Sequence, residues 1–515
     1  MTRKWWTLTA VCMGIFMLLL DITVVNVALP SIARSLAASF DDLQWVVDAY
    51  ALTLAALLLT AGSLADRIGR RAVFTTGLGV FTLSSLACAL APDALFLIVA
   101  RAVQGIGGAA MFATSLSLLA QEFQGRDRGT AFGIYGATTG ASVALGPVLG
   151  GLLTTGLGWH AIFLLNIPIG LATIGLTLTR VAETRNPSAG RLDWPGFATF
   201  SAALAAFVFA LIRGNALGWS SSLIVACLSG AALLLMLFIV IERRRAEPML
   251  DLRLFATPTF SGASVAAFAI SASIFALLLY ITIYLQSVLG LSALGAGLRL
   301  LPLTLLSFVC AGAAGKASEH MPARLMLAAG LGLIGAGLLA MRGIDAASTW
   351  SALLAGFCLC GLGVGLVNPP LSSIVIGVVT PAQSGMASGM NNTFRQVGIA
   401  TGIAGLGAVF QHQVHQVIQA TLGSGAHATQ FAQAISAGAG AQAIAHAPAG
   451  ARPLLTHAQH AAFASALNEV FLIGALVALA GALASLLLVR SRDLIATAPS
   501  PSQTIATSHV LASTA

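Results

Sequence analysis

A succession of long apolar stretches, separated by short polar ones, constrains this chain more than any other feature. The stretch "MGIFMLLLDITVVNVALP", residues 13–30, is apolar almost throughout. A helix needs about 20 apolar residues to cross the hydrocarbon of a bilayer, and in lipid a helix satisfies its own backbone hydrogen bonds. The sequence therefore predicts an all-α integral membrane protein with fourteen transmembrane helices. These spans are expected at residues 8–30, 44–63, 71–91, 94–121, 129–156, 160–179, 194–212, 220–242, 259–285, 293–314, 323–341, 349–378, 385–411 and 462–489.

The composition excludes a soluble protein. Of the 515 residues, 57% are hydrophobic and only 8% are charged, whereas soluble domains carry about 25% charged residues. The N-terminal apolar run extends to Pro30, well past the apolar core of about 7–15 residues of a secretory signal. We therefore expect this run to be retained as the first span.

The basic residues predict the orientation of the chain. With the N-terminus inside, eighteen of the 25 Lys and Arg residues fall on the cytoplasmic side and four fall outside. The other three, Arg101, Arg299 and Arg395, lie within spans. A cytoplasmic excess of Lys and Arg is the usual topological signal. It predicts a multi-pass protein of the cell (inner) membrane with both termini in the cytoplasm, and it accounts for the net charge of +8 without a nucleic-acid partner.

An internal repeat divides the chain. The segment "GSLADRIGRR", Gly62 to Arg71, follows the second span, and "GKASEHMPAR", Gly315 to Arg324, follows the tenth. Parallel repeats with a site at their interface are typical of transporters. We expect a six-helix half at residues 1–180, an inserted pair of spans at 181–258 and a second six-helix half at 259–490. Residues 414–460 should form a polar extracytoplasmic loop, and residues 491–515 a disordered cytoplasmic tail.

Asp21 is the least expected residue of the first span, because a carboxylate at the middle of a membrane helix costs about 2.5–3.5 kcal/mol on insertion scales. An acid that stayed neutral would be better replaced by Asn, so we expect Asp21 to take up and release a proton. Arg101 is its expected partner, since an embedded guanidinium needs an anion. The alternative is that Asp21 only fixes helix packing through a hydrogen bond.

Other polar residues in apolar spans should face the bundle interior. Asp48 lies four residues into the second span, where it contacts a substrate or proton or sits at the outer interface. The spacing leaves open which polar residues line a cavity. The tentative set is Asp48, Gln104, Asn368, Asn392 and Arg395.

Two stretches carry glycine at positions that favour a tight turn or close helix packing. In the loop after the second span, Gly69 permits a tight reversal, and Asp66 can cap a helix or pair with a nearby Arg. In the fifth span, Gly146 and Gly150 have the spacing that lets helices approach closely. Pro147 predicts a bend there. These glycines serve either packing or gating.

These stretches together resemble the major facilitator superfamily. The loop is similar to its cytoplasmic-loop signature, and "LIVARAVQGIGGAA" and "GASVALGPVLGGLL" resemble its fourth-span motif and its fifth-span exporter motif. The segments "LDITVVNVALP", "WVVDAYALT", "IFLLNIPIG", "LDWPG", "YLQSVLG" and "NNTFRQVG" resemble the fourteen-span drug:proton antiporters of the EmrB/QacA type. His160 departs from that pattern, which often has Arg after the Trp, and the second copy of the loop signature is degraded.

The resemblance implies two six-helix halves plus two inserted central helices. It implies proton-coupled export of drugs or other toxic amphipathic small molecules by alternating access, with Asp21 and Arg101 in proton coupling. The matching loop residues imply a conformational latch: Gly62, Asp66, Arg67, Gly69, Arg70 and Arg71. The matching fifth-span residues imply an antiport motif: Gly146, Pro147, Gly150 and Gly151. The C-terminal half is expected to lack a matching latch.

Competing functions are weaker on the sequence. No H-E-x-x-H segment or comparable catalytic motif is present, so we expect neither an enzyme nor a cofactor. Six His residues cluster in residues 412–460, but no Cys or carboxylate lies between residues 411 and 461, so no metal site is expected. A dedicated exporter of a single metabolite or antibiotic remains the alternative. The expected partners are the substrate, protons and the lipid bilayer, with a periplasmic adaptor and an outer-membrane channel if the host is Gram-negative.

Overall fold

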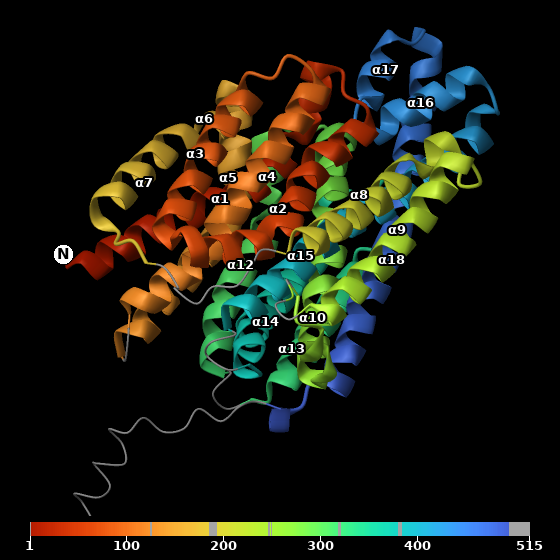
Figure 1. Ribbon diagram of the computed structural model, residues 1–515. Helices are drawn as coiled ribbons and strands as arrows, with labels where there is room; N and C mark the ends of the chain where they lie inside the picture. Colours follow the sequence, from red (N-terminus) through yellow and green to blue (C-terminus); the bar gives the residue numbers. More distant parts are fainter. Residues whose placement is uncertain are drawn as a thin grey trace, which may run out of the picture.

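The computed structural model describes residues 2–123, 126–184, 193–245, 248, 250–317, 321–379 and 384–493. Every regular element in these residues is a helix, and the helices form an elongated bundle (Figure 1). The predicted all-α class is therefore confirmed. The tail from residue 494 onward, predicted to be disordered, lies outside the described residues.

The first half of the bundle contains the elements up to residue 180. Ser39 and Asp93 begin two of its helices, because their side chains accept hydrogen bonds from the backbone amides of Asp42 (3.2 Å) and Phe96 (2.8 Å), groups that a first helical turn leaves unpaired. The helices are α1 (Arg3–Leu36), α2 (Phe40–Ile68), α3 (Arg70–Ala89), α4 (Ala94–Glu122), α5 (Arg126–Leu157), α6 (His160–Leu164) and α7 (Asn166–Arg180).

Two long helices, α8 (Trp194–Leu217) and α9 (Ser222–Arg244), follow and lie beside the bundle (Figure 1). α8 packs against α2 and α15, and α9 packs mainly against α8. Val208 of α8 is fully buried in a small cluster with Ala55 of α2 and Ala404 of α15. The inserted pair thus covers a seam between the two halves. A short turn, η1 (Leu252–Ala256), leads on to the second half.

The second half begins with a helix interrupted by two π-helical turns. Such turns occur often at functional sites. Its elements are α10 (Pro258–Ile270), η2 (Ser271–Phe275), α11 (Ala276–Ile283), η3 (Tyr284–Val288), α12 (Ala293–Ala317), α13 (Ala323–Ala340), η4 (Trp350–Leu353), α14 (Leu354–Gly377), α15 (Ser384–Leu422), α16 (Ala426–Ser436), α17 (Gly440–His446), η6 (Ala449–Ala451), α18 (Arg452–Leu488) and η7 (Ser491–Asp493).

The predicted count of fourteen membrane-crossing helices is not confirmed. Among the described residues, twelve helices are long and apolar enough to cross a membrane. The predicted spans 44–63 and 385–411 are helical, as α2 and α15, but neither is among the twelve. For α15 the polar residues account for this, whereas α2 is only partly covered by the count, because the side chains of residues 59, 63 and 66 lie outside the described part of the chain. α2 carries Asp41, Asp42 and Asp48, and α15 carries Arg395 among several amides.

The stretch 414–460, predicted to be a simple polar loop, is instead helical. α15 continues to Leu422, and α16 and α17 form a cap at one end of the bundle (Figure 1). Phe431, Ala432 and Ile435 of α16 are buried. Composition misled the prediction, because Ala and Gln are good helix formers as well as common loop residues. We call this end of the bundle the cap end, and the opposite end, with Arg3, Arg245 and Asp493, the terminal end.

The two halves meet chiefly through α5 with α12 and through α2 with α15. Side-chain hydrogen bonds between the halves gather toward the cap end. Gln44 Nε2 donates to the carbonyl of Ile403 at 2.9 Å, and Gln286 Nε2 donates to the carbonyl of Val27 at 2.7 Å. Both donors are buried. These bonds therefore hold the halves together at the cap end.

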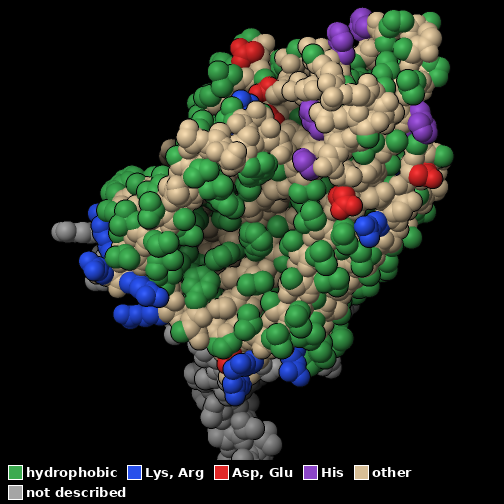
Figure 2. Space-filling view, turned by 90° about the vertical axis from the view of Figure 1, so that its right-hand side faces the viewer, with side chains coloured by type: hydrophobic (Ala, Val, Ile, Leu, Met, Phe, Trp, Pro, Cys, Tyr) green, Lys and Arg blue, Asp and Glu red, His purple; other side chains and the backbone are tan. Residues whose placement is uncertain are grey.

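Toward the terminal end, α5 and α12 separate. A methyl group added at Gly151 of α5 would lie 2.6 Å from the carbonyl oxygen of Ala293, and one added at Gly140 would lie 3.0 Å from the ring of Phe308. One added at Gly136 would meet no described atom within 4 Å. The bundle is thus closed at the cap end and open between α5 and α12 at the terminal end. Figure 2 shows that one face of the molecule is hollowed.

Candidate functional site

Asp21 lies in a closed polar cluster inside the first half. Its carboxylate accepts hydrogen bonds from Arg101 Nη1 at 2.5 Å, Gln104 Nε2 at 3.0 Å and Asn166 Nδ2 at 3.0 Å. Each of these four residues exposes 1% of its surface or less. The structure thus brings Asp21 and Arg101 together as an ion pair inside the bundle. The buried carboxylate oxygens of Asp21 are thus satisfied by three side-chain donors.

Arg101 is oriented by several neighbours besides Asp21. Its Nε donates to the backbone carbonyl of Val46 at 3.1 Å, and its Nη1 donates to Gln104 Oε1 at 2.6 Å. The ring centroid of Tyr50 lies 4.3 Å from the guanidinium carbon. Gly105, one turn along α4, lets α2 come close, because a methyl group there would lie 2.5 Å from the carbonyl oxygen of Tyr50. The cation is therefore fixed between α1, α2 and α4.

Three members of this cluster were missed by sequence reasoning: Ser85, Asn166 and Tyr50. Ser85 Oγ accepts from Gln104 Nε2 at 2.8 Å and from Asn166 Nδ2 at 3.2 Å. Asn166 stands at the start of α7 within "IFLLNIPIG". A polar amide in an apolar run was a visible signal there. The cluster therefore joins side chains or carbonyls of five helices: α1, α2, α3, α4 and α7.

Asp48 of α2 has a different environment. It is fully buried, and neither carboxylate oxygen has a hydrogen-bond partner among the described residues. One turn earlier on α2, Gln44 bonds to the carbonyl of Ile403 in α15, and Tyr280 of α11 donates to the same carbonyl at 2.5 Å. Asp48 thus lies on the helix that joins the first half to α15.

The fifth-span residues lie where α5 touches both α1 and α12. A methyl group added at Gly150 would lie 2.9 Å from the carbonyl oxygen of Val24, three residues past Asp21 on α1. Gly146 faces Thr23, and the Pro147 carbonyl faces Gly297 of α12. Gly151 contacts the start of α12, as described above. The segment connects the helix that carries Asp21 to the second half.

The turn between α2 and α3 is stabilised by an acid that sequence reasoning missed. The Glu183 carboxylate accepts from the backbone amides of Arg71 and Ala72, each at 3.1 Å, at the start of α3. Gly69 has φ +130°, and a side chain there would lie 2.5 Å from the Glu183 carboxylate. The Arg70 amide donates to the Thr184 carbonyl at 3.0 Å. An anion at a helix N-terminus is favourable, and here it comes from the segment after α7.

Other residues of the predicted latch contribute differently. Arg67 is exposed at the end of α2, and a methyl group added at Gly62 would lie 3.9 Å from Ala113 Cβ of α4. The side chain of Asp66, which we expected to act as a cap or ion-pair partner, lies outside the described residues. In the described part, this turn contacts the end of α7 and so lies within the first half.

In the second half, Arg395 of α15 donates to the Asn368 side chain of α14. Asn392 and Arg395 are both partly exposed. Asn391 is buried, and its Oδ1 has no hydrogen-bond partner among the described residues. No described ion pair includes Arg395. The second half thus holds an embedded cation next to an amide, where the first half holds one next to a carboxylate.

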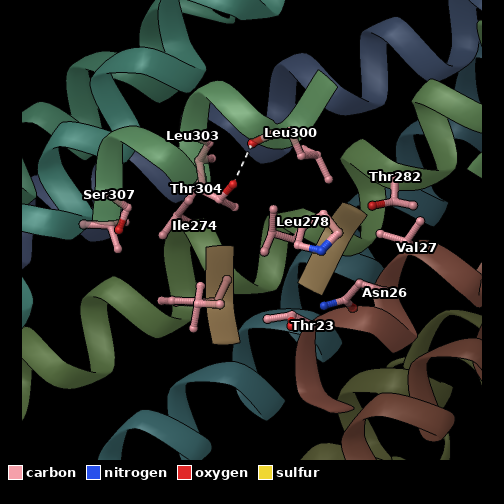
Figure 3. A pocket seen from close by; sticks show the side chains of 14 residues that line it. Thr23, Asn26, Val27, Ile274, Leu278, Thr282, Leu300, Leu303, Thr304 and Ser307 are labelled. Carbon is pink, nitrogen blue, oxygen red and sulfur yellow. Dashed lines mark hydrogen bonds between the residues drawn. The ribbon is translucent and has the colours of Figure 1, made fainter. Parts of the chain in front are cut away.

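A small cavity lies between the halves (Figure 3). Its volume of about 30 Å³ holds roughly one water molecule. Thr23, Asn26 and Val27 reach it from α1, a few residues past Asp21, and Thr282, Thr304 and Ser307 reach it from the second half. The rest of the wall is apolar: Val143, Pro147, Ile274, Phe275, Leu278, Leu300, Leu303 and Val364.

The tentative cavity residues differ from this lining. Gln104 belongs to the closed cluster around Asp21, and Asp48 is buried on α2. Asn368, Asn392 and Arg395 do not touch the cavity either. Their contact with substrate therefore stays a prediction, because spacing identifies inward-facing positions on a helix but not the depth at which two halves leave space between them.

The clustered His residues lie at the cap end (Figure 2). His412 bonds to Gln416 at 2.9 Å, and His460 Nδ1 lies 3.2 Å from the carbonyl of Ala346. Among the described residues, no three His, Cys, Asp or Glu side chains come close enough together to hold a metal ion.

Comparison with known proteins identifies the family. The family model of the major facilitator superfamily matches residues 11–403, and the chain belongs to this superfamily. The bundle of apolar helices with a buried ion pair is therefore that of a membrane transporter, not an enzyme.

Several curated relatives are similar over most of the chain. It is 38% identical over 404 residues to the multidrug resistance protein Stp of Mycobacterium tuberculosis, covering 78% of this chain and 75% of that protein. It is 33% identical over 493 residues to the tetracenomycin C resistance and export protein of Streptomyces glaucescens, covering 94% and 91%.

A solved structure shares the fold. It is the crystal structure of a bacterial homolog of the human lysosomal transporter Spinster, in an inward-facing and unoccupied conformation. The TM-score is 0.62 with 17% identity, and the match covers 96% of this chain and 99% of that one.

Proposed function

We propose that this protein is a proton-coupled secondary exporter of drugs or other toxic amphipathic small molecules that works by alternating access. The observation that carries the proposal is the buried Asp21 carboxylate, held by Arg101, Gln104 and Asn166 on the helix that also lines the cavity between the halves. Intramembrane acids of this kind mark proton pathways. The names of the relatives, which describe multidrug resistance and antibiotic export, support the substrate class.

The geometry suggests how a proton moves the bundle. Protonation of Asp21 removes the charge that Arg101 neutralises, so the bonds that join α1 to α4 and α7 weaken together. Two residues further along α1, Thr23 meets both the cavity and Gly146 of α5. A shift of α1 is therefore transmitted through α5 to α12. Substrate in the cavity and a proton on Asp21 would thus act on the same helices, as coupled binding requires.

Asp21→Asn tests the coupling directly. The variant keeps the shape of the side chain but cannot titrate, so it should abolish uptake of a fluorescent dye driven by a pH gradient in proteoliposomes, while dye binding persists. Asp93→Asn, which changes an exposed helix-capping acid, is the matched control and should retain transport. If Asp21→Asn still concentrates dye with undiminished dependence on the pH gradient, Asp21 is not the coupling residue and Asp48 becomes the next one to test.

We also propose how the chain crosses the membrane. We place fourteen helices across the membrane, counting α2 and α15, because α2 packs along α4 and α15 packs along α18 within the bundle. We place both termini in the cytoplasm of a cell-membrane protein, since most visible Lys and Arg side chains gather at the terminal end (Figure 2). In a Gram-negative host, a periplasmic adaptor and an outer-membrane channel would carry the substrate onward.

We also assign roles to the remaining predicted residues. The turn with Gly62, Asp66, Arg67, Gly69, Arg70 and Arg71 holds one global state as a latch, and Gly146, Pro147, Gly150 and Gly151 transmit the motion of α1. Asp48, Asn368, Asn392 and Arg395 contact substrate when the bundle opens further. Gln104 orients Asp21 and Arg101.

A dedicated exporter of one metabolite or antibiotic is the second candidate. It is favoured by a relative named for a single compound, the methylenomycin A resistance protein of Streptomyces coelicolor, 38% identical over 403 residues that cover 78% of this chain and 85% of that protein. Metabolite profiling of a deletion strain distinguishes the two. A dedicated exporter leaves one product accumulating inside the cell, whereas a broad exporter leaves none.

A further inference from the structure

A second, larger cavity lies at the cap end, outside the site described above. Its volume is about 530 Å³, within the range of about 300–1,000 Å³ that is usual for small-molecule sites. Its wall includes Ser31 and Arg34 of α1, Thr155 of α5, Ser287 of η3 and Gln442 of α17. Both halves and the cap therefore contribute to it, and hydroxyl and amide groups are frequent in its lining.

Two polar groups in the wall of the cavity are available to a ligand: a hydroxyl without a hydrogen-bond partner and a guanidinium without an anion. The hydroxyl of Thr154 is buried, with 8% of the residue exposed, and has no hydrogen-bond partner among the described residues. Arg34 donates only to neutral groups of its own helix, the Pro30 carbonyl and the Ser31 hydroxyl, each at 3.2 Å. Arg34 is exposed at the rim of the cavity and takes part in no described ion pair. Buried hydroxyls are normally bonded, and a guanidinium prefers a carboxylate or phosphate.

We propose that this cavity binds a small anionic molecule rich in hydroxyl groups, and that the bound molecule holds the cap ends of the two halves together. Arg34 receives the anionic group, while Thr154 and the nearby hydroxyl and amide side chains bond to the hydroxyls of the ligand. The site is distinct from the central cavity, and its binding chemistry does not depend on the proposed export function.

Binding in this cavity should affect the opening of the cap end, because α5 and α12 both line the cavity. Leu294 N of α12 already donates to Thr155 Oγ1 of α5 across the same cavity, at 3.1 Å. Opening the cap end must separate these two helices, so the complete cavity exists only in the closed arrangement. A ligand that binds only one of two states shifts the population toward that state. The ligand should therefore inhibit transport from the extracytoplasmic side, a direction that rests on the orientation proposed above.

The experiment uses the full-length protein in nanodiscs and a matched pair of probes. Lactobionate carries a carboxylate on a disaccharide-derived polyol, and lactitol is its neutral counterpart. Calorimetric titration should show lactobionate binding about tenfold or more tightly than lactitol, because only lactobionate offers the Arg34 guanidinium a charge-assisted hydrogen bond. Equal binding of the two probes, or no binding of either, overturns the proposal without any variant.

Two substitutions then locate the site. Arg34→Gln should remove the preference for lactobionate, whereas Arg342→Gln, which removes a cap-end cation paired with Glu469 at 4.0 Å, should not. Thr154→Val should weaken binding of both probes while leaving the thermal unfolding midpoint unchanged or raised, because it deletes an unpartnered hydroxyl. A merely structural Thr154 would instead lower the midpoint and leave binding intact. Wild-type affinity in both variants overturns the proposal.

In proteoliposomes of defined orientation, lactobionate added to the extracytoplasmic side should slow transport, and lactobionate added to the other side should not. Inhibition from both sides, or from neither, contradicts the proposed closure. The titration in nanodiscs reports on binding even if the export assay fails, so the two proposals can fail separately.

Discussion

The two buried acids of the first half differ at the level of single atoms. The Asp21 carboxylate receives three side-chain donors, among them Arg101, whereas both oxygens of Asp48 lack a partner among the described residues. A guanidinium remains charged in proteins, so Arg101 cannot escape the loss of its anion by releasing a proton. Replacing Asp21 should therefore lower the free energy of unfolding much more than replacing Asp48.

Asp21→Asn should lower the free energy of unfolding by about 3–5 kcal/mol, because it leaves a buried cation unpaired. The double variant Asp21→Asn/Arg101→Gln should recover most of this loss, since it removes both charges. Asp48→Asn serves as the control and should change stability little. Thermal unfolding of the purified variants in one detergent checks all three. Additive losses in the double variant would contradict the pairing as a source of stability.

His415 should make the cap end sensitive to acid. It lies on α15 beyond the predicted span 385–411, and burial, with a further contribution from the neighbouring His412, lowers its pKa. The folded protein therefore binds fewer protons here than the unfolded chain. The resulting loss of folding stability is absent when the pH is above the histidine pKa of the unfolded chain, about 6.5, and it grows as the pH falls below that value.

Hydrogen exchange of residues 412–422 measures this effect. Protection should decrease as the pH falls from about 7 toward 5, after correction for the intrinsic exchange rate, because the unfolded state gains the proton first. His415→Asn should flatten the dependence. His427→Asn, at an exposed position of α16, should not. An unchanged profile in His415→Asn would assign the acid sensitivity to another group.

At this scale, sequence reasoning could pair Asp21 with Arg101, because a cation and an acid embedded in apolar helices have few alternatives. It could not place Asn166, Ser85 or Glu183, which reach their partners from other helices. Their contacts depend on how distant segments pack, and hydropathy patterns along one helix do not contain that information.

At the scale of elements, the length of an apolar stretch predicted the helices correctly, whereas the composition of a polar stretch did not. Every predicted span became a helix, because lipid leaves the backbone no other choice. The Ala-, Gln- and His-rich stretch near the C-terminus gave no such constraint. Its folding into α16 and α17 depends on Phe431 and Ile435, two of the few large apolar side chains there, which are buried against the bundle.

Phe431→Ala should therefore loosen the cap while the spans remain intact. Removing a buried Phe side chain costs about 3–5 kcal/mol, which exceeds what a short helix such as α16 supplies by itself. Hydrogen exchange over residues 426–446 should accelerate, and exchange in α1 and α4 should not. Gln430→Ala, at an exposed neighbouring position, is the control. Unchanged protection in Phe431→Ala would mean that other contacts fix the cap.

At the scale of the whole molecule, the relation between α5 and α12 shows which state the protein adopts. Near Gly151 the two backbones are in contact, near Gly140 only a side chain bridges them, and at Gly136 no described atom lies within 4 Å. These positions lie on one face of α5, at spacings close to whole helical turns. Alternating access requires the opposite arrangement in the other state, in which the helices separate near Gly151 and close near Gly136.

Substitution at the two ends of this face should therefore shift the population in opposite directions. Gly151→Val forces a side chain against Ala293 and Leu294. Such overpacking costs about 1–3 kcal/mol, which destabilises the cap-closed state. Gly136→Val meets no described atom in this structure, but it should obstruct closure of the terminal end and so favour the state seen here.

Spin labels at Leu157 and Ser292, both exposed at the cap end, report the separation of α5 and α12 in a cysteine-free background. We expect the longer distance to gain population in Gly151→Val and to lose it in Gly136→Val. A shift in the same direction for both would show that α5 and α12 do not exchange contacts between their ends, and α2 with α15 would become the pair to examine.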